Sequence, residues 1–331
     1  MTWLTWRQFR VPALSVFAGL AVIGVILAIT GPDLVGQTDF SDEDFLYTGT
    51  MLVMYVLPAV IGVFWGVPMI TRELETGTHS LIWNQTITRR RWFATKVGVG
   101  VLVAMIAAGL LSLAVTWWSS PIDALANQQT DRGMLNWLSP PVFSARGLAP
   151  IGYAAFAFVL GVTCGIVLRR TVLAMGVTLV ALVGVLLAVP FLVRPYFLPP
   201  LEQTIAISGD SVMGAHGDNT GVIEGIVVAE PAGGWVLADE TIDPAGKVVS
   251  PLPDFVQKCM PRPGEPRTGP PPSPGGMQSC LAQLGERGYH QRITYQPGYR
   301  FWPLQWIELA FFLALSALLT WFCFRRLRHL S

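Results

Sequence analysis

Six long apolar runs constrain this chain more than any other feature of its sequence. A helix needs roughly 20 mainly apolar residues to cross the hydrocarbon core of a bilayer. The 331 residues are 52% hydrophobic and only 13% charged, whereas soluble proteins carry about 25% charged residues. We therefore expect an all-α polytopic membrane protein with six transmembrane helices. These helices are predicted at Val11–Thr30, Thr50–Ile70, Phe93–Trp117, Leu148–Leu168, Thr171–Phe191 and Trp302–Phe324.

The basic residues of the short connections predict the orientation, because Lys and Arg concentrate in cytoplasmic loops. With the N-terminus inside, the two short outer loops hold only Arg132 and Arg146. Both termini then lie on the inner side. We expect the protein in the cytoplasmic (inner) membrane of a bacterium. A net charge of +1 gives no reason to expect a nucleic-acid partner. The inner segments hold Arg7, Arg10, Arg72, Arg89, Arg90, Arg91, Lys96, Arg169, Arg170, Arg325, Arg326 and Arg328.

The spacing of the runs divides the chain into four parts. The longest connection separates the fifth and sixth runs, and it is long enough for a small domain. We expect an interfacial N-terminal segment at 1–10, five helices within 11–193 with an inner loop at 71–92, an extracellular domain at 194–300, and the sixth helix with a basic tail at 301–331.

The predicted extracellular domain is of mixed and irregular structure. Val222–Val228 and Gly234–Ala238 favour short strands, since both are rich in β-branched residues and bounded by Gly or Pro. Pro251–Pro274 is dense in proline and glycine, which favours irregular backbone.

Cys259 and Cys280 both lie in this outer segment. Disulfides form and persist in oxidising compartments, so we expect these two residues to be bonded; the alternative is two free thiols. Closing a loop of about 20 residues would contribute roughly 3 kcal/mol in the chain-entropy description. Cys164 and Cys323 lie within spans and are expected to be small packing residues.

The sequence shows no motif for chemistry of its own. It contains no G-x-x-x-x-G-K-[ST] phosphate loop, no H-E-x-x-H and no G-x-S-x-G, and its four histidines are scattered. We therefore expect no catalytic residue, no metal site and no cofactor bound by this chain.

Two features of the spans have open interpretations. Glu308 lies inside the sixth run, either at outer headgroup level near Arg300 or as an intramembrane polar contact between helices or along a route through them. Two G-x-x-x-G patterns permit close helix approach, either within the bundle or between two copies. They consist of Gly62 and Gly66, and of Gly161 and Gly165.

The inner loop between the second and third runs is the most informative segment. Its sequence is TRELETGTHSLIWNQTITRRRWFATK, from Thr71 to Lys96. Gly77 allows a sharp turn, and Thr78 is placed to cap a short helix. Trp83 and Ile87, four residues apart, would share one face of this helix, which would lie on the inner surface of the membrane. We expect this face to contact a partner.

This loop resembles that of the permease subunits of type-2 ABC exporters, which carry R-E-x-E-x-G-T after their second helix. The matching residues are Arg72, Glu73, Glu75, Gly77 and Thr78, with Arg89 and Lys96 after them. Six helices, inside termini and a large outer segment between helices five and six also match that layout. The outer segment here is larger than in many members of the family.

The resemblance implies an ABC ATPase subunit bound at the inner loop, with ATP and Mg on that partner. It also implies a second permease copy, identical or a paralogue, and surrounding membrane lipid. Without the resemblance, the loop would be a generic solvated inner loop. A membrane receptor or sensor with an extracellular ligand domain is the alternative, although the longest inner segment, about 25 residues, leaves no room for a signalling domain.

Overall fold

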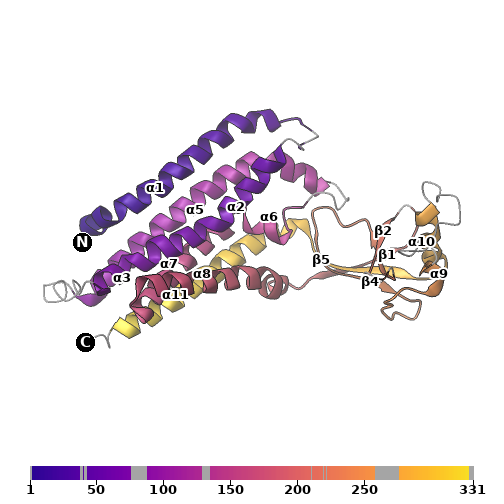
Figure 1. Ribbon diagram of the computed structural model, residues 1–331. Coiled ribbons are helices and arrows are strands. Elements are labelled where there is room, and N and C mark those ends of the chain that lie inside the picture. Colours follow the sequence, from indigo (N-terminus) through magenta and orange to yellow (C-terminus); the bar gives the residue numbers. More distant parts are fainter. Residues whose placement is uncertain are drawn as a thin grey trace. The chain divides into compact units, whose positions relative to one another are not determined.

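The computed structural model describes residues 2–37, 40, 43–75, 88–128, 135–209, 211–218, 220, 222–257 and 276–327. The chain forms two compact units (Figure 1). We call the unit of Met1–Leu125, Ser139–Leu198 and Arg300–Ser331 the helical unit, and that of Ala126–Leu138 and Pro199–Tyr299 the insert unit. The insert unit thus begins at Pro199 rather than at 194 as predicted, and it takes in a second segment ahead of α7.

Among its described residues, the helical unit contains six helices that are long and apolar enough to cross a membrane, which confirms the predicted fold class. Figure 1 shows that α1 begins and α11 ends at the same end of this unit. The elements are α1 (Thr2–Thr30), η1 (Gly31–Leu34), α2 (Asp44–Val60), η3 (Ile61–Gly66), α3 (Val67–Glu75), α5 (Arg89–Gln128), α6 (Pro140–Ser144), α7 (Ala149–Leu168), α8 (Thr171–Ala188), η4 (Val189–Val193), η5 (Arg194–Tyr196) and α11 (Phe301–Leu327). The last residues of α5 and the first two of η6 (Gly298–Arg300) belong to the insert unit.

Two helices are longer than the apolar runs that predicted them. α1 starts at Thr2, so the expected interfacial segment is continuous with the first span. α5 continues beyond Trp117 to Gln128. Its extension keeps a buried stripe at Trp118, Ile122 and Ala126. Side chains three to four residues apart share one helix face, so a helix can continue after uniform hydrophobicity ends.

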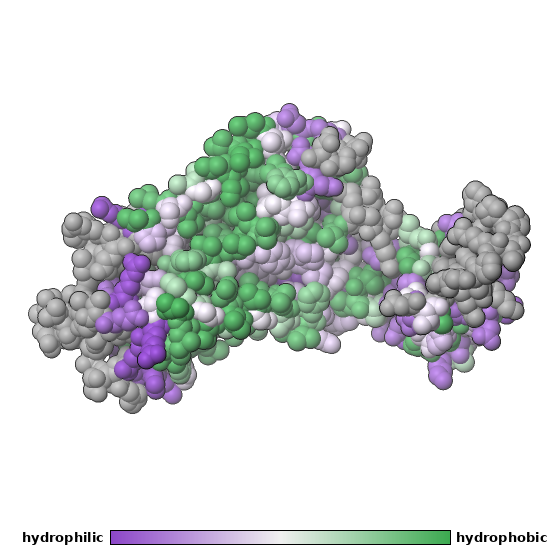
Figure 2. All heavy atoms as spheres, in the orientation of Figure 1, coloured by the Kyte–Doolittle hydropathy of each residue, from purple (hydrophilic) through white to green (hydrophobic). Residues whose placement is uncertain are grey.

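α7 is the centre of the helical unit. Fifteen of its 20 residues are buried, most of them Ala, Gly, Val and Phe. By contrast, α8 exposes large apolar side chains, including Val172 with 83% exposure. Figure 2 shows apolar residues over much of the visible surface of the helical unit. This distribution is that of a multi-pass membrane protein, whose lipid-facing surface is as apolar as its interior.

The two G-x-x-x-G patterns pack against each other within one chain. A Cβ atom added at Gly62 would lie 2.7 Å from the carbonyl oxygen of Ala157 in α7. A Cβ at Gly161 would collide with the carbonyl oxygen of Gly62, and one at Gly66 with that of Phe158. Gly165 faces Thr71 and Val67 in the same way. The glycines therefore let η3 and α3 approach α7 backbone to backbone.

In the part that the structure describes, the insert unit contains two antiparallel sheets and two helices. One sheet has the order β1 (Leu201–Ala206), β5 (His290–Gln296), β4 (Trp235–Ile242), and the other pairs β2 (Val212–Gly217) with β3 (Ile223–Val228). The predicted strands correspond to β3 and β4. α9 (Asp254–Gln257) and α10 (Gly276–Glu286) complete the unit. α9 falls within the segment expected to be irregular, and 258–275 lie outside the described residues.

Buried residues from both sheets and both helices form the core of the insert unit. Ile226, Val228 and Val256 are fully buried, and so are Leu281 and Leu284 on α10. Alternate residues of a strand point to one face, so each sheet contributes only part of its side chains to this core.

Cys164 and Cys323 are free, as expected for residues within spans. Cys280 lies on α10, and Cys259 lies outside the described residues. The bond between Cys259 and Cys280 therefore stays a prediction.

Replacing Gly161 by Ala should lower the thermal unfolding midpoint of the detergent-purified protein. The added methyl group meets a carbonyl oxygen that cannot move alone, and overpacking costs about 1–3 kcal/mol. Gly176→Ala on α8 is the matched control, because a Cβ there meets nothing within 4 Å. The control should be neutral or slightly stabilising, since alanine favours helix by about 0.5–1 kcal/mol over glycine. Equal effects of both variants would contradict the packing account.

Peptide mapping without reduction should recover Cys259 and Cys280 in one cross-linked peptide pair. Alkylation of the unreduced protein should label neither residue. Labelling of both thiols in protein taken from intact membranes would contradict the predicted bond.

Candidate functional site

Glu73 anchors the last turn of α3 to the beginning of α5. Its carboxylate forms a salt bridge with Lys96, whose side chain is 6% exposed. The ammonium group of Lys96 lies 5.0 Å from the centroid of the Trp92 ring and 3.5 Å from the carbonyl oxygen of Met69. A buried charge is costly unless it is paired and hydrogen-bonded. This pair therefore fixes where α3 and α5 meet, next to the inner loop.

Glu75, two residues later, anchors α3 to the start of α8. Its carboxylate accepts hydrogen bonds from the backbone N–H of Thr171 at 2.7 Å and from the Thr171 hydroxyl at 2.9 Å. The backbone N–H and then the hydroxyl lower the pKa of Glu75. The contact is therefore present above the usual glutamate pKa and is lost as the pH falls through the lowered value. An acidic group at a helix N-terminus also interacts favourably with the helix dipole.

The middle of the predicted coupling element, with Gly77, Thr78, Trp83 and Ile87, lies outside the described residues. The described residues continue from Thr88, whose hydroxyl accepts a hydrogen bond from the backbone N–H of Arg91 at 3.3 Å. Arg72, on α3, is exposed. The inner loop therefore leaves α3 and enters α5 where α3 is bound to both α5 and α8, through the Glu73–Lys96 and Glu75–Thr171 contacts.

A second polar site is buried inside the helical unit. Arg194 of η5 and Glu308 of α11 form a bidentate salt bridge, with Nε–Oε2 at 2.7 Å and Nη2–Oε1 at 2.8 Å. Both side chains are 0% exposed. Arg and carboxylate match each other in this two-bond geometry, which makes the contact strong and directional.

Three further side chains contact this pair. The hydroxyl of Tyr153 on α7 donates to Glu308. Arg194 Nη2 donates to the hydroxyl of Ser144 on α6 at 2.8 Å. The guanidinium group also lies 4.2 Å from the centroid of the Phe143 ring, a favourable cation–π distance. One charge pair thus joins α6, α7, η5 and α11.

A neighbouring network holds the start of α7 in the same unit. Arg146 pairs with Asp123 of α5 at 3.2 Å, and Asp123 also accepts from the hydroxyl of Tyr47 at 3.1 Å. The side-chain oxygen of Gln305 accepts from the backbone N–H groups of Leu148 and Ala149 at 2.8 and 2.7 Å. These bonds satisfy donors that a helix N-terminus leaves unpaired.

Glu308 is therefore a contact between helices, and its partner is Arg194 rather than Arg300. The sequence alone missed Arg194, Asp123 and Arg146, because each lies at or beyond the end of an apolar run. One signal was present: a lone acid within a span needs a cationic or hydrogen-bonding partner. Among the described residues, no group of three or more His, Cys, Asp or Glu could hold a metal ion.

Comparison with known protein families gives a match over part of the chain. A family model described as ABC-2 membrane transporter related matches residues 32–194. The matched segment includes the whole inner loop, its anchors Glu73 and Glu75, and both glycine patterns. No curated protein and no solved structure matches the chain.

Replacing Glu308 by Gln should destabilise the protein by about 3–5 kcal/mol, because it leaves Arg194 buried without its counter-charge. The double variant Arg194→Met/Glu308→Leu should recover much of this loss, since apolar pairs of similar volume can replace a buried ion pair. Thermal unfolding in detergent measures both effects. A single variant as stable as the wild type would show that the pair is not isolated from water.

Proposed function

The chain belongs to the ABC-2 membrane transporter related family over residues 32–194, and we propose that it is the permease subunit of an ATP-driven exporter. ATP and Mg bind to a separate ATPase subunit. A second permease copy, identical or a paralogue, completes the transport path. The family match carries this proposal, together with the way in which the inner loop is attached to the helices.

The inner loop between 75 and 88 is the proposed docking site for the ATPase. Its first anchor is the Glu73–Lys96 pair, which ties α3 to α5. Its second anchor is the Glu75–Thr171 contact, which ties α3 to α8. A displacement of the loop would therefore move three spans together instead of bending one of them. This is the property that a mechanical coupling element needs.

The Arg194–Glu308 pair supports the same proposal from within the bundle. It holds η5 and α11 against α6 and α7 through buried bonds, so these elements resist separation. We propose that the helices rock about this fixed region when the ATPase subunits close. Two packed arrangements related by a rigid rotation are a common basis of such transitions.

The insert unit carries no part of the family match beyond its first segment, because Pro199–Tyr299 lie outside the matched residues. Its role is therefore not implied by the family. In a receptor or sensor, the insert unit would be the ligand-binding domain. We would favour this alternative function if no ATPase is found.

The anchor at Glu73 can be tested by charge reversal. Glu73→Lys and Lys96→Glu should each reduce the P-loop ATPase that co-purifies in mild detergent, by about fivefold or more. The reason is that like charges at a buried contact cost several kcal/mol. The double swap Glu73→Lys/Lys96→Glu restores opposite charges and should recover most of the co-purification.

Arg10→Glu is the matched control for Lys96→Glu, because it makes the same charge change at an exposed residue of α1. It should leave ATPase co-purification unchanged. Normal co-purification by both single reversals would refute the anchoring role. Absence of any ATPase from the wild-type preparation, in several detergents, would refute the permease proposal and favour a receptor.

A further inference from the structure

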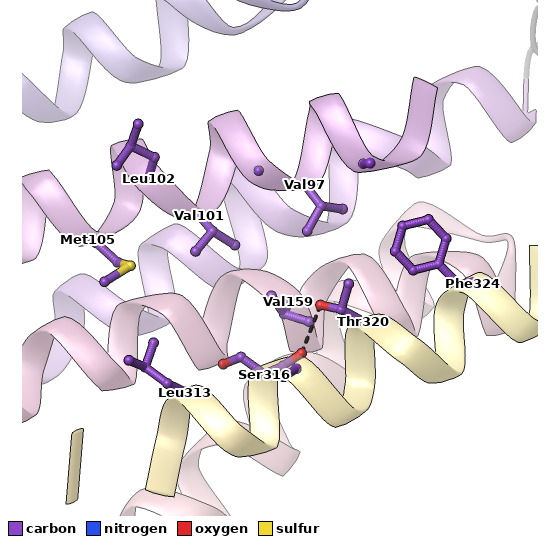
Figure 3. A pocket seen from close by; sticks show the side chains of 12 residues that line it. Val97, Val101, Leu102, Met105, Val159, Leu313, Ser316, Thr320 and Phe324 are labelled. Carbon is purple, nitrogen blue, oxygen red and sulfur yellow. Dashed lines mark hydrogen bonds between the residues drawn. The ribbon is translucent and has the colours of Figure 1, made fainter. Parts of the chain in front are cut away.

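A groove of about 540 Å³ runs between α5 and α11 in the helical unit (Figure 3). The two helices are antiparallel, with Met105 and Leu313 near one end of the groove and Val97 and Phe324 near the other. Val159 of α7 lies between them. The volume of the groove is in the range of small-molecule binding sites. The proposed permease function assigns no role to this groove.

The lining of the groove offers almost no hydrogen bonds to a ligand. Of its 12 residues only Ser316 and Thr320 carry side-chain polar groups other than sulfur. Ser316 donates to the carbonyl oxygen of Phe312 at 2.7 Å, and Thr320 donates to that of Ser316 at 2.8 Å. Only the hydroxyl oxygens of these two residues could still accept a hydrogen bond, so a polar ligand would lose its water with little compensation, which is unfavourable. The occupant that fits is a hydrocarbon chain.

The groove opens toward lipid rather than toward water. Leu102 is 59% exposed, and Ala94, Gly98 and Ala317 are exposed as well. All four belong to the membrane-spanning segments Arg90–Asn127 and Gly298–Leu327. The hydrocarbon tails of the bilayer are therefore the molecules that meet this opening.

Basic and aromatic side chains gather at one end of the groove. Phe93 and Phe324 are in edge-to-face contact with their centroids 5.0 Å apart, which brings the start of α5 to the end of α11. Arg90 and Arg91 are exposed one turn before Ala94. On α11, the guanidinium group of Arg325 lies 3.9 Å from the centroid of the exposed Trp321 ring. Arg and Trp side chains of this kind are typical of the headgroup level on the cytoplasmic side.

We propose that this groove binds an anionic phospholipid. One acyl chain lies between α5 and α11, and the headgroup phosphate pairs with Arg90, Arg91 and Arg325. Basic pockets between transmembrane helices recognise anionic headgroups by charge, whereas a bare apolar groove would not distinguish headgroups. The proposal goes beyond the permease function and does not depend on an ATPase, because it concerns the isolated chain.

Native mass spectrometry of the full chain in detergent tests it, with dioleoylphosphatidylglycerol and dioleoylphosphatidylcholine as the two probes. The wild type should retain the anionic lipid selectively. Arg90→Gln/Arg91→Gln should lower the affinity for phosphatidylglycerol by roughly fivefold per arginine and remove the selectivity. Arg169→Gln/Arg170→Gln is the control, since it removes two charges on the same predicted side at the α7–α8 connection.

Filling the groove separates acyl-chain binding from headgroup attraction. Gly98→Phe or Ala317→Phe should reduce retention of both lipids, while Gly176→Phe on α8 should not; Cβ atoms at Gly98 and Gly176 meet nothing within 4 Å. Unchanged thermal unfolding shows that the variants fold. Equal retention of the two lipids by the wild type, or unchanged retention by both groove variants, would overturn the proposal.

Discussion

Charges buried among membrane-spanning helices must be paired, and this requirement fixes much of the helical unit. Arg194 and Glu308 lie on either side of the insert in the sequence, five residues before Pro199 and eight after Arg300. Their salt bridge therefore joins the two chain segments that lead into and out of the insert. Removing either partner would leave a charge in an environment without water. Loss of one partner should therefore destabilise the fold more than a local change around the pair.

Close contact between backbones stabilises the helical unit where no charge pairs are present. Between helices in lipid there is no hydrophobic driving force, so stability depends on packing and on satisfied polar groups. Gly62, Gly66 and Gly161 bring η3 and α7 into direct contact. This rigid centre lies beside the anchors of the inner loop, because α3 continues directly from η3. A movement at Glu73 or Glu75 is thus received by helices that cannot easily slide past one another.

The sequence predicts the six spans well because length and apolarity alone define a transmembrane helix. It also draws attention to Glu73 and Glu75, because they follow the second span directly, but as residues that couple to an ATPase and not as anchors between helices. It does not predict their partners. Lys96 lies 23 residues beyond Glu73 and Thr171 lies 96 beyond Glu75, and only tertiary packing brings them together.

The burial of Arg194 and Arg146 could not be predicted from the sequence either. Both follow or precede apolar runs, where the ordinary expectation is a solvated loop residue, yet both are fully buried or nearly so. Their position depends on α6, a five-residue helix too short to register as a hydrophobic segment. In the insert unit, β3 and β4 were predicted from their β-branched residues. By contrast, β2 reads VMGAHG, and its two glycines and histidine give little strand signal.

The central claim is that an ATPase binds at the inner loop. The most direct measurement replaces Trp83 with a photo-crosslinking phenylalanine analogue in the full chain, irradiates native membranes, and identifies the captured protein by mass spectrometry. The account predicts a P-loop ATPase as the major adduct at position 83 and none at a control position such as Val180 on the exposed face of α8. Capture of lipid alone, or of no ATPase, would contradict it.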